Sequence, residues 1–282
     1  MFKIISNDII AENLHKLVLF APRVARARKA GQFVMVRLAR GEERIPLTIS
    51  DADPEAGTIT LFIQAIGMAT RKIVTARAGE SIRDVAGPLG QATRITRWGR
   101  VVCVGGGVGT AVLYPLVKAL AEAGNQVTTI IGGRSQPFII LAKELTSLST
   151  TLIITTEDGS LGMQGFVTAP LAQLLGDAEH VPQAVFAVGP VPMMKAVVAM
   201  TRPLKIETIV SLNPIMIDGT GMCGGCRVTI GAETKFACVD GPEFNGHLVD
   251  FDNLADRLTC YRSEEATHGM PSECKIGRGT TP

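Results

Sequence analysis

Residues 101–110 read Val101-Val102-Cys103-Val104-Gly105-Gly106-Gly107-Val108-Gly109-Thr110, an apolar run that ends in a glycine-rich turn. The next ten residues, 111–120, are mostly apolar and favour a helix. A glycine turn between a strand and a helix lets the backbone approach a phosphate at the helix N-terminus, although a purely structural tight turn has the same pattern. We therefore predict the first βα unit of a nucleotide-binding α/β domain.

Four more strand-like runs follow at the spacing of βα units. They lie at 126–135, 151–159, 184–190 and 207–212, and a helical run follows the third of them at 192–198. Strands that alternate with helices predict a doubly wound parallel sheet, with ligands at the carboxyl ends of its strands. We assign this domain to residues 98–212.

The end of the second predicted strand differs from that of a typical dehydrogenase. The run 126–135 closes with Gly132-Gly133-Arg134-Ser135, which has no acidic residue to bind the ribose hydroxyls. Arg134 has two interpretations, a contact to the 2′-phosphate of NADP(H) or a solvated surface charge. The choice between NAD(H) and NADP(H) therefore stays open in the sequence.

The first 97 residues have the pattern of an antiparallel β-barrel or sandwich. Short alternating runs, separated by turn clusters such as 51–57, lie at 17–20, 33–38 and 58–63. We assign residues 1–97 to one β domain.

Two segments of this β domain place polar groups beside constrained backbone. The segment 44–50 surrounds Pro46, and the segment 64–74 has a glycine before a predicted one-turn helix whose first amides can hold a phosphate. Each segment alone is also typical of an ordinary polar strand edge.

Three of the six cysteines, Cys223, Cys226 and Cys238, fall within sixteen residues, and Asp218 stands five positions before the first of them. The spacing Asp-x4-Cys-x2-Cys is that of a plant-type [2Fe–2S] site with an aspartate in place of the first thiolate. A carboxylate oxygen also ligates iron, as a harder ligand than a thiolate. A predicted hairpin that carries the last cysteine back beside the loop has its strands at 227–230 and 234–239.

Two other interpretations of these cysteines remain open. A zinc site would use all three thiols with a fourth ligand from Asp218, His247 or Cys260, and a redox dithiol would use only Cys223 and Cys226. Spacing alone does not choose between iron and zinc. A chain that also binds flavin and nicotinamide has a use for a one-electron relay, which favours iron.

The bulk composition narrows the class of protein. A chain of 282 residues is long enough for two or three compact units, and 46% hydrophobic residues indicate a well-buried globular protein. A net charge of +2 and 5% aromatic residues argue against a nucleic-acid binder. No apolar run is long enough to span a bilayer and no signal peptide is recognisable, so we expect a cytoplasmic protein without disulfides. Cys103 is predicted to be a core residue, and Cys260 and Cys274 to be bystanders.

The combination of these motifs resembles a known family. The sequence is similar to the electron-transfer subunits of dihydroorotate dehydrogenase, in the ferredoxin–NADP reductase superfamily, over residues 2–250. Within that group it most resembles the α (small) subunits of NADH-dependent ferredoxin:NADP oxidoreductase, also known as sulfide dehydrogenase β subunits. The motifs that carry the resemblance are Pro46-Leu47-Thr48, Gly67-x2-Thr70, Asp84-x2-Gly87-Pro88-Leu89-Gly90, residues 104–110, Thr156-Glu157-Asp158-Gly159, Gly189-Pro190-x2-Met193-Met194 and the cysteine loop.

The resemblance implies three cofactors and their binding residues. FAD would contact Ile45, Pro46, Leu47, Thr48, Phe62, Ile63, Gln64, Gly67, Ala69 and Thr70. NAD(H), or NADP(H), would contact Gly105, Gly106, Gly107, Gly109, Thr110, Arg134, Asp158, Gly189, Pro190 and Met193. A [2Fe–2S] cluster would bind Asp218, Cys223, Cys226 and Cys238.

Two departures from the orotate-pathway pattern matter for the choice of function. Asp218 replaces the first of four cysteines, which favours the ferredoxin:NADP oxidoreductase group. Ile45 stands where the orotate-pathway proteins have an arginine, and Arg44 lies one position early. We therefore do not assign a phosphate contact to Arg44.

The expected fold is an antiparallel flavin-binding β-barrel at 1–97, a doubly wound nucleotide-binding domain at 98–212, an iron–sulfur loop and hairpin at 213–250, and a polar C-terminal tail at 251–282. The expected function is hydride exchange between NAD(H) and FAD, with single electrons passing through the cluster to a larger flavin and [4Fe–4S] partner. That partner would be glutamate-synthase-like, would form a heterodimer with this chain, and would reach ferredoxin and complete electron bifurcation.

Cofactors carry this chemistry, so we predict no acid–base catalyst. The four histidines, which we interpret as surface or packing residues, are His15, His180, His247 and His268. The alternatives are an electron-transfer subunit of an NAD-dependent dihydroorotate dehydrogenase, a zinc-stapled docking subunit, and a free-standing reductase.

Overall fold

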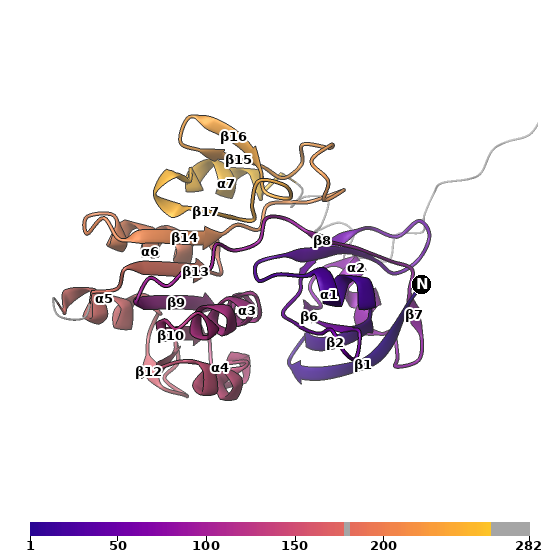
Figure 1. Cartoon of the computed structure of the whole chain (residues 1–282), viewed down its shortest axis with the longest axis horizontal. Helices are drawn as coiled ribbons and strands as arrows, with labels where there is room; N and C mark the ends of the chain where they lie inside the picture. The colour runs from indigo at the N-terminus through magenta and orange to yellow at the C-terminus, as the bar shows by residue number, and fades with distance from the viewer. Residues whose placement is uncertain (178–180, 261–282) are drawn as a thin grey trace, which may run out of the picture.

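The computed structural model describes residues 1–177 and 181–260. Figure 1 shows a β-rich body formed by the N-terminal part of the chain beside an α/β body, with the C-terminal hairpin packed along the latter. Within the described ranges no helix is long and apolar enough to cross a membrane. His180, His268 and Cys274 lie outside the described residues.

The N-terminal body consists of two antiparallel sheets, as expected for the barrel. The five-stranded sheet has the order β5 (Asp51–Asp53), β6 (Thr58–Gln64), β2 (Leu14–Phe20), β1 (Phe2–Ala11) and β7 (Ser81–Ile82). The three-stranded sheet has the order β4 (Ile45–Thr48), β3 (Phe33–Arg37) and β8 (Asp84–Leu89). Inward-facing aliphatic residues of both sheets, such as Leu17, Leu19 and Val34, form one core. Its two helices are α1 (Pro22–Ala27) and α2 (Met68–Val74), the latter being the predicted short helix.

The α/β body contains the predicted doubly wound parallel sheet. The strand order is β12 (Met163–Gln164), β11 (Thr151–Thr156), β10 (Gln126–Gly133), β9 (Arg100–Gly106), β13 (Ala184–Val188), β14 (Glu207–Ser211) and β17 (Glu243–Asn245). All neighbouring pairs are parallel except β14 and β17. The helices are α3 (Gly109–Glu122), α4 (Ala142–Leu148), α5 (Thr168–Gly176) and α6 (Val191–Thr201), with a 3₁₀ turn η1 at Gln136–Phe138.

Strand β9 is buried on both faces of this sheet, which explains its continuous apolar run. Val101 and Cys103 pack with α3 and α4, whereas Val102 and Val104 pack with α5 and α6. Cys103 is fully buried, as predicted for a core residue. The carboxyl end of β9, where its glycines lie, points toward the barrel (Figure 1).

The C-terminal part of the described chain is more closely joined to the α/β body than expected. The hairpin of β15 (Arg227–Ile230) and β16 (Glu233–Phe236) forms as predicted, and Cys238 follows it by two residues. Strand β17 then adds to the edge of the nucleotide sheet through pairs such as Ser211 with Glu243. The sheet therefore does not end at residue 212, and the expected domain boundaries remain a prediction.

A short helix, α7 (Phe251–Arg257), follows the 3₁₀ turn η2 (Gly246–Leu248). It occupies a segment expected to be a polar tail, and that expectation is wrong for these residues. Phe251 and Leu254 are buried against β14, β15 and α6, because one face of the helix is apolar.

Candidate functional site

The loop after β14 is held together by the carboxylate of Asp218. One carboxylate oxygen accepts the N–H of Thr220 and the other accepts the N–H of Cys223, each at 2.9 Å. These hydrogen bonds, first that from Thr220, hold the pKa of Asp218 below its usual range. A charged carboxylate therefore stands where the sequence spacing predicts the first ligand of an iron–sulfur cluster.

Backbone amides also point at two sulfurs of this segment. Gly225 N–H donates to Sγ of Cys223 at 3.4 Å, and Cys238 N–H donates to Sγ of Cys226 at 3.5 Å. The Sγ atoms of Cys226 and Cys238 lie 3.2 Å apart, because the hairpin brings the last cysteine back to the loop. Amide hydrogen bonds to the sulfur ligands tune the reduction potential of an iron–sulfur cluster.

The three cysteines differ in exposure. Cys226 and Cys238 are buried, whereas Cys223 lies at the surface. Burial, and then the neighbouring Cys226, raises the pKa of Cys238 to about 12, and a bound metal cation would favour its thiolate form. Three thiols, one charged carboxylate and two aimed amides form a donor set that fits a [2Fe–2S] cluster.

Across residues 1–177 and 181–260, no group of three or more His, Cys, Asp and Glu side chains is close enough to hold a single metal ion, and this applies to the four predicted cluster ligands as well. His247, one of the possible fourth ligands of zinc, instead has its Nε2 atom 3.3 Å from Oγ1 of Thr201. Cys260 is exposed beyond the end of α7.

The residues expected to bind FAD lie on β4, at the end of β6 and at the start of α2. Pro46 is exposed, and Ile45, Leu47 and Thr48 are half-buried, so β4 has an accessible edge. Thr70 closes the start of α2, since its Oγ1 atom accepts the N–H of Gly67 at 3.0 Å.

Two of the expected FAD residues have side chains that face elsewhere. Ile63 is fully buried in the barrel core, so a flavin contact there would come from its backbone. Phe62 packs with Leu14, Ala111 and Ile140, in a small apolar cluster that joins the barrel to the α/β body. The sequence pattern did not reveal this packing role, because the partners of Phe62 lie in another domain.

The expected nucleotide residues of two separate segments meet at the carboxyl ends of β9 and β13. A Cβ atom on Gly106 would lie 2.6 Å from Sδ of Met193, and one on Gly109 would lie 2.9 Å from Cα of Gly189. Packing therefore requires glycine at 109, where the close atoms belong to the backbone, whereas at 106 the flexible Met193 side chain would have to move. Thr110 is buried beneath the turn.

Gly107 differs from its neighbours in the same turn. It has φ +55°, and a Cβ atom there would meet no atom within 4 Å. Gly107 and Gln64 line the same small hollow between the two bodies, about 50 Å³ in volume, together with Leu14 and Phe138. The expected flavin and nucleotide segments therefore face each other at this point.

Arg134 and Asp158 lie together after β10 and β11. Asp158 N–H donates to the carbonyl oxygen of Arg134 at 3.2 Å. The carboxylate of Asp158 accepts the hydroxyl and the N–H of Ser160, which lowers the pKa of Asp158. Arg134 itself is exposed, and its position leaves the choice between NAD(H) and NADP(H) open.

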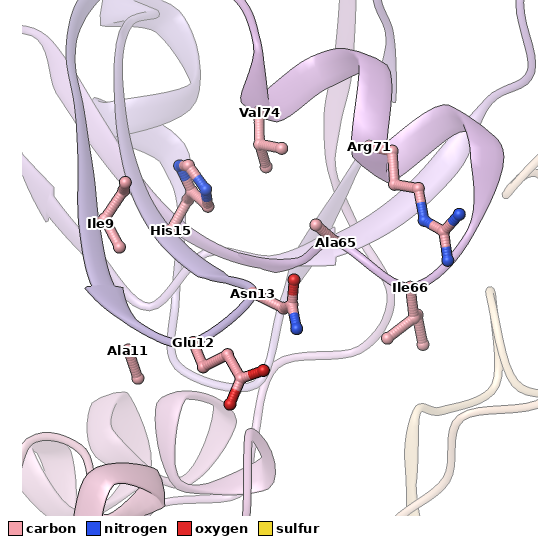
Figure 2. A pocket seen from close by; sticks show the side chains of 9 residues that line it. All are labelled: Ile9, Ala11, Glu12, Asn13, His15, Ala65, Ile66, Arg71 and Val74. Carbon is pink, nitrogen blue, oxygen red and sulfur yellow. The ribbon is translucent and has the colours of Figure 1, made fainter.

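A larger cavity, of about 600 Å³, lies on the barrel beside the expected FAD segment. Figure 2 shows that the β1–β2 hairpin contributes Glu12, Asn13 and His15, and that α2 contributes Arg71. Its remaining lining residues are Ile9, Ala11, Ala65, Ile66 and Val74. Sequence reasoning missed this cavity, since the hairpin tip carries no motif. The cavity borders the segment 65–71, which includes residues expected to bind FAD.

Comparison with known proteins supports the family resemblance that the sequence motifs indicate. Residues 213–250 match the model of the iron–sulfur cluster binding domain of dihydroorotate dehydrogenase B. A Thermotoga maritima protein, described as a homolog of the dihydroorotate dehydrogenase B (NAD(+)) electron transfer subunit, is 44% identical over 93% of this chain and 92% of its own length. The dihydroorotate dehydrogenase B (NAD(+)) electron transfer subunit of Shouchella clausii is 33% identical over 86% of this chain and 94% of its own length.

The chain belongs to the dihydroorotate dehydrogenase B electron transfer subunit family. This confirms the resemblance seen in the sequence and makes the chain an electron-transfer subunit of a flavin-dependent oxidoreductase, which works with a partner subunit. A solved structure of the NADH-dependent reduced ferredoxin–NADP oxidoreductase, a system of flavin-based electron bifurcation, matches with a TM-score of 0.89 and 43% identity. It covers 95% of this chain and 96% of the matched chain, so the β plus α/β fold is confirmed over almost the whole length.

Proposed function

We propose that this chain is the small subunit of an electron-bifurcating NADH-dependent ferredoxin:NADP oxidoreductase. It exchanges a hydride between NAD(H) and FAD and passes single electrons through a [2Fe–2S] cluster to a larger subunit that contains flavin and [4Fe–4S] clusters. The observation that carries the proposal is the donor set of one charged carboxylate and three thiols, in a segment that packs on β3 and β8 of the barrel.

The bound cofactors supply the chemistry: FAD accepts a hydride from NADH, and the cluster relays electrons one at a time. The protein supplies position and environment. Gly107 leaves open space opposite Gln64, at the junction of the two bodies. Asp218 would supply a charged oxygen ligand to the cluster, and the amides of Gly225 and Cys238 donate to Sγ of Cys223 and Cys226, which would hold it.

The bifurcating function is favoured over the orotate-type function by Asp218. The orotate-type pattern has a cysteine at this position, and the two groups otherwise share the fold.

The cofactors are tested on the chain purified without oxygen, or reconstituted with iron, sulfide and FAD. We expect flavin and iron–sulfur absorption bands, two iron atoms per chain, and bleaching of the flavin band by NADH. Zinc without iron, or a spectrum without either band after reconstitution, would overturn the proposal.

The partner is tested by purifying the complex through a tag on this chain. We expect a large glutamate-synthase-like flavoprotein with [4Fe–4S] clusters, and NADPH-dependent reduction of ferredoxin coupled to NAD⁺ reduction. Recovery of a dihydroorotate dehydrogenase instead would establish the orotate-type function, and turnover of the isolated chain with ferredoxin would establish a free-standing reductase.

A further inference from the structure

The cluster segment lies directly on the barrel, without an intervening element. Cys226 and Cys238 belong to one buried apolar group with Phe33 and Met35 of β3 and with Met216. Met35 is almost fully buried, at 1% exposure. The strand under the predicted cluster ligands is therefore β3.

Gly219, the residue after Asp218, makes the tightest part of this contact. A Cβ atom on Gly219 would lie 2.6 Å from Cγ of Met35 and 3.0 Å from Cδ1 of Leu89. Its φ of +76° also disfavours any other residue. The backbone beside the predicted carboxylate ligand thus rests on the Met35 side chain.

Strand β3 pairs with β8 on one side and with β4, the proposed flavin strand, on the other. In the β3–β4 pair, Met35 is directly opposite Pro46 and Phe33 is opposite Thr48. Residues opposite each other in an antiparallel pair lie on the same face of the sheet, about 5 Å apart at Cβ. Met35 therefore contacts the cluster loop and is also a direct cross-strand neighbour of the strand proposed to hold FAD.

We propose that Met35 is a positioning residue that fixes the gap between the cluster loop and the flavin strand, and so sets the rate of electron transfer across it. The inference rests on the proposed function. In the step concerned, one electron leaves the flavin that NADH has reduced and one ferric iron of the cluster becomes ferrous, with no covalent bond formed. The rate of electron transfer falls steeply as the distance between flavin and cluster increases. A loosely held cluster loop would therefore slow this step.

The test compares Met35→Ala, Gly219→Ala and Met35→Leu with the wild-type chain, each with flavin and iron contents measured. Stopped-flow mixing with NADH separates reduction of the flavin from reduction of the cluster. We expect unchanged flavin reduction and a roughly tenfold to hundredfold slower cluster reduction in Met35→Ala and Gly219→Ala. Met35→Leu, which nearly conserves volume, should restore most of the wild-type rate.

Two measurements that do not depend on turnover accompany this test. Redox titration followed by EPR should show a shifted cluster potential in Gly219→Ala, and hydrogen exchange should be faster at the amides of Thr220 and Cys223. Gly79→Ala is the matched control, because Gly79 has φ +92° and a Cβ atom there would meet no atom within 4 Å. It should alter none of these quantities.

Unchanged cluster reduction in both Met35→Ala and Gly219→Ala, with full cofactor content, would overturn the inference while leaving the proposed function intact. If Met35→Ala fails to retain iron, Met35→Val replaces it as a smaller truncation, and the same rate comparison decides. A wild-type chain that binds neither flavin nor iron would instead refute the proposed function itself.

Discussion

Asp218 is the residue on which the choice of function depends. Its carboxylate is charged and accepts two backbone amides, so it has an ordered position even without iron. We predict that Asp218→Cys retains the cluster and lowers its midpoint potential, because a thiolate donates more charge to ferric iron than a carboxylate does. An EPR-monitored redox titration measures this shift. An identical midpoint would show that Asp218 is not a ligand.

Glu243 is a buried acid whose pKa makes the stability of the fold depend on pH, although no cofactor contact is assigned to it. Burial raises the pKa of Glu243 to about 7, while a hydrogen bond from the Thr93 hydroxyl at 2.8 Å lowers it slightly. Below pH 4.5 the group is protonated in the folded and unfolded states alike. As the pH rises to 7 the unfolded chain loses this proton first, so the free energy of unfolding falls with pH.

The predicted loss is at most about 3 kcal/mol, complete above about pH 7. Glu243→Gln keeps an acceptor for Thr93 and should therefore be more stable than the wild type at about pH 8 and similar to it at about pH 4.5. Urea unfolding across this pH range measures the difference, with Glu55→Gln on an exposed turn as the control. Parallel pH profiles for the wild type and Glu243→Gln would contradict the assignment.

At the scale of elements, α7 connects the end of the described chain to the cluster loop. Leu254 is 1% exposed, and Nη2 of Arg257 donates to the carbonyl oxygen of Gly225 at 3.0 Å. We predict that Leu254→Ala lowers the free energy of unfolding by about 2–5 kcal/mol and reduces the iron retained per chain. Thermal unfolding and iron analysis measure both effects. Asp256→Ala, on the exposed side of α7, should change stability by less than about 0.5 kcal/mol.

The sequence predicted the elements that have strong local patterns. The βα units are examples, because β9 is uniformly apolar and a glycine turn follows it. The antiparallel edge strand β17 was missed, since three residues carry no periodic signal and their place depends on pairing with β14. Helix α7 did have a sequence signal, an N-cap at Asp250 and apolar residues at Phe251 and Leu254. Because the helix has only 7 residues and most of them are polar, its sequence was interpreted as a polar tail.

In the candidate site too, the sequence predicted features with a local pattern and missed contacts between residues that are distant in sequence. The spacing from Asp218 to Cys226 identified a metal loop, and the structure adds the hydrogen bonds that order it. The contact of Met35 with Gly219 joins residues that are distant in sequence, so no local pattern contained it. Phe62 is predicted to contact FAD, and the structure adds that its side chain packs between two domains.

At the scale of the whole molecule, the chain brings its three proposed cofactor regions together through contacts between domains. The apolar cluster around Phe62 joins the barrel to the α/β body on one side. Lys118 of α3 adds an ion pair with Asp51 of the barrel, at 3.3 Å. The cluster segment is fixed on the other side, where the side chain of Gln91 donates to the carbonyl oxygen of Val239 at 2.7 Å. The α/β body and the cluster segment therefore both contact the barrel, which is the proposed flavin domain.

This arrangement gives Gly107 a role that only the assembled molecule creates. Gly107 faces open space opposite Gln64, so a side chain at 107 would enter the hollow between the two bodies. We predict that Gly107→Ala slows reduction of the flavin by NADH by roughly tenfold or raises the KM for NADH by a similar factor. The FAD and iron contents should stay unchanged, because neither proposed site includes this residue.

Strain at positive φ needs its own control, since alanine at φ +55° costs roughly 1 kcal/mol in stability. Gly41→Ala supplies it: Gly41 has φ +85° and open space around its Cβ position, and it lies on an exposed loop of the barrel. Gly41→Ala should lose similar stability and keep normal kinetics with NADH. Equal kinetics in Gly107→Ala and the wild type would mean that the nicotinamide does not approach the flavin through this hollow, and the proposed order of cofactors would then fail at its first step.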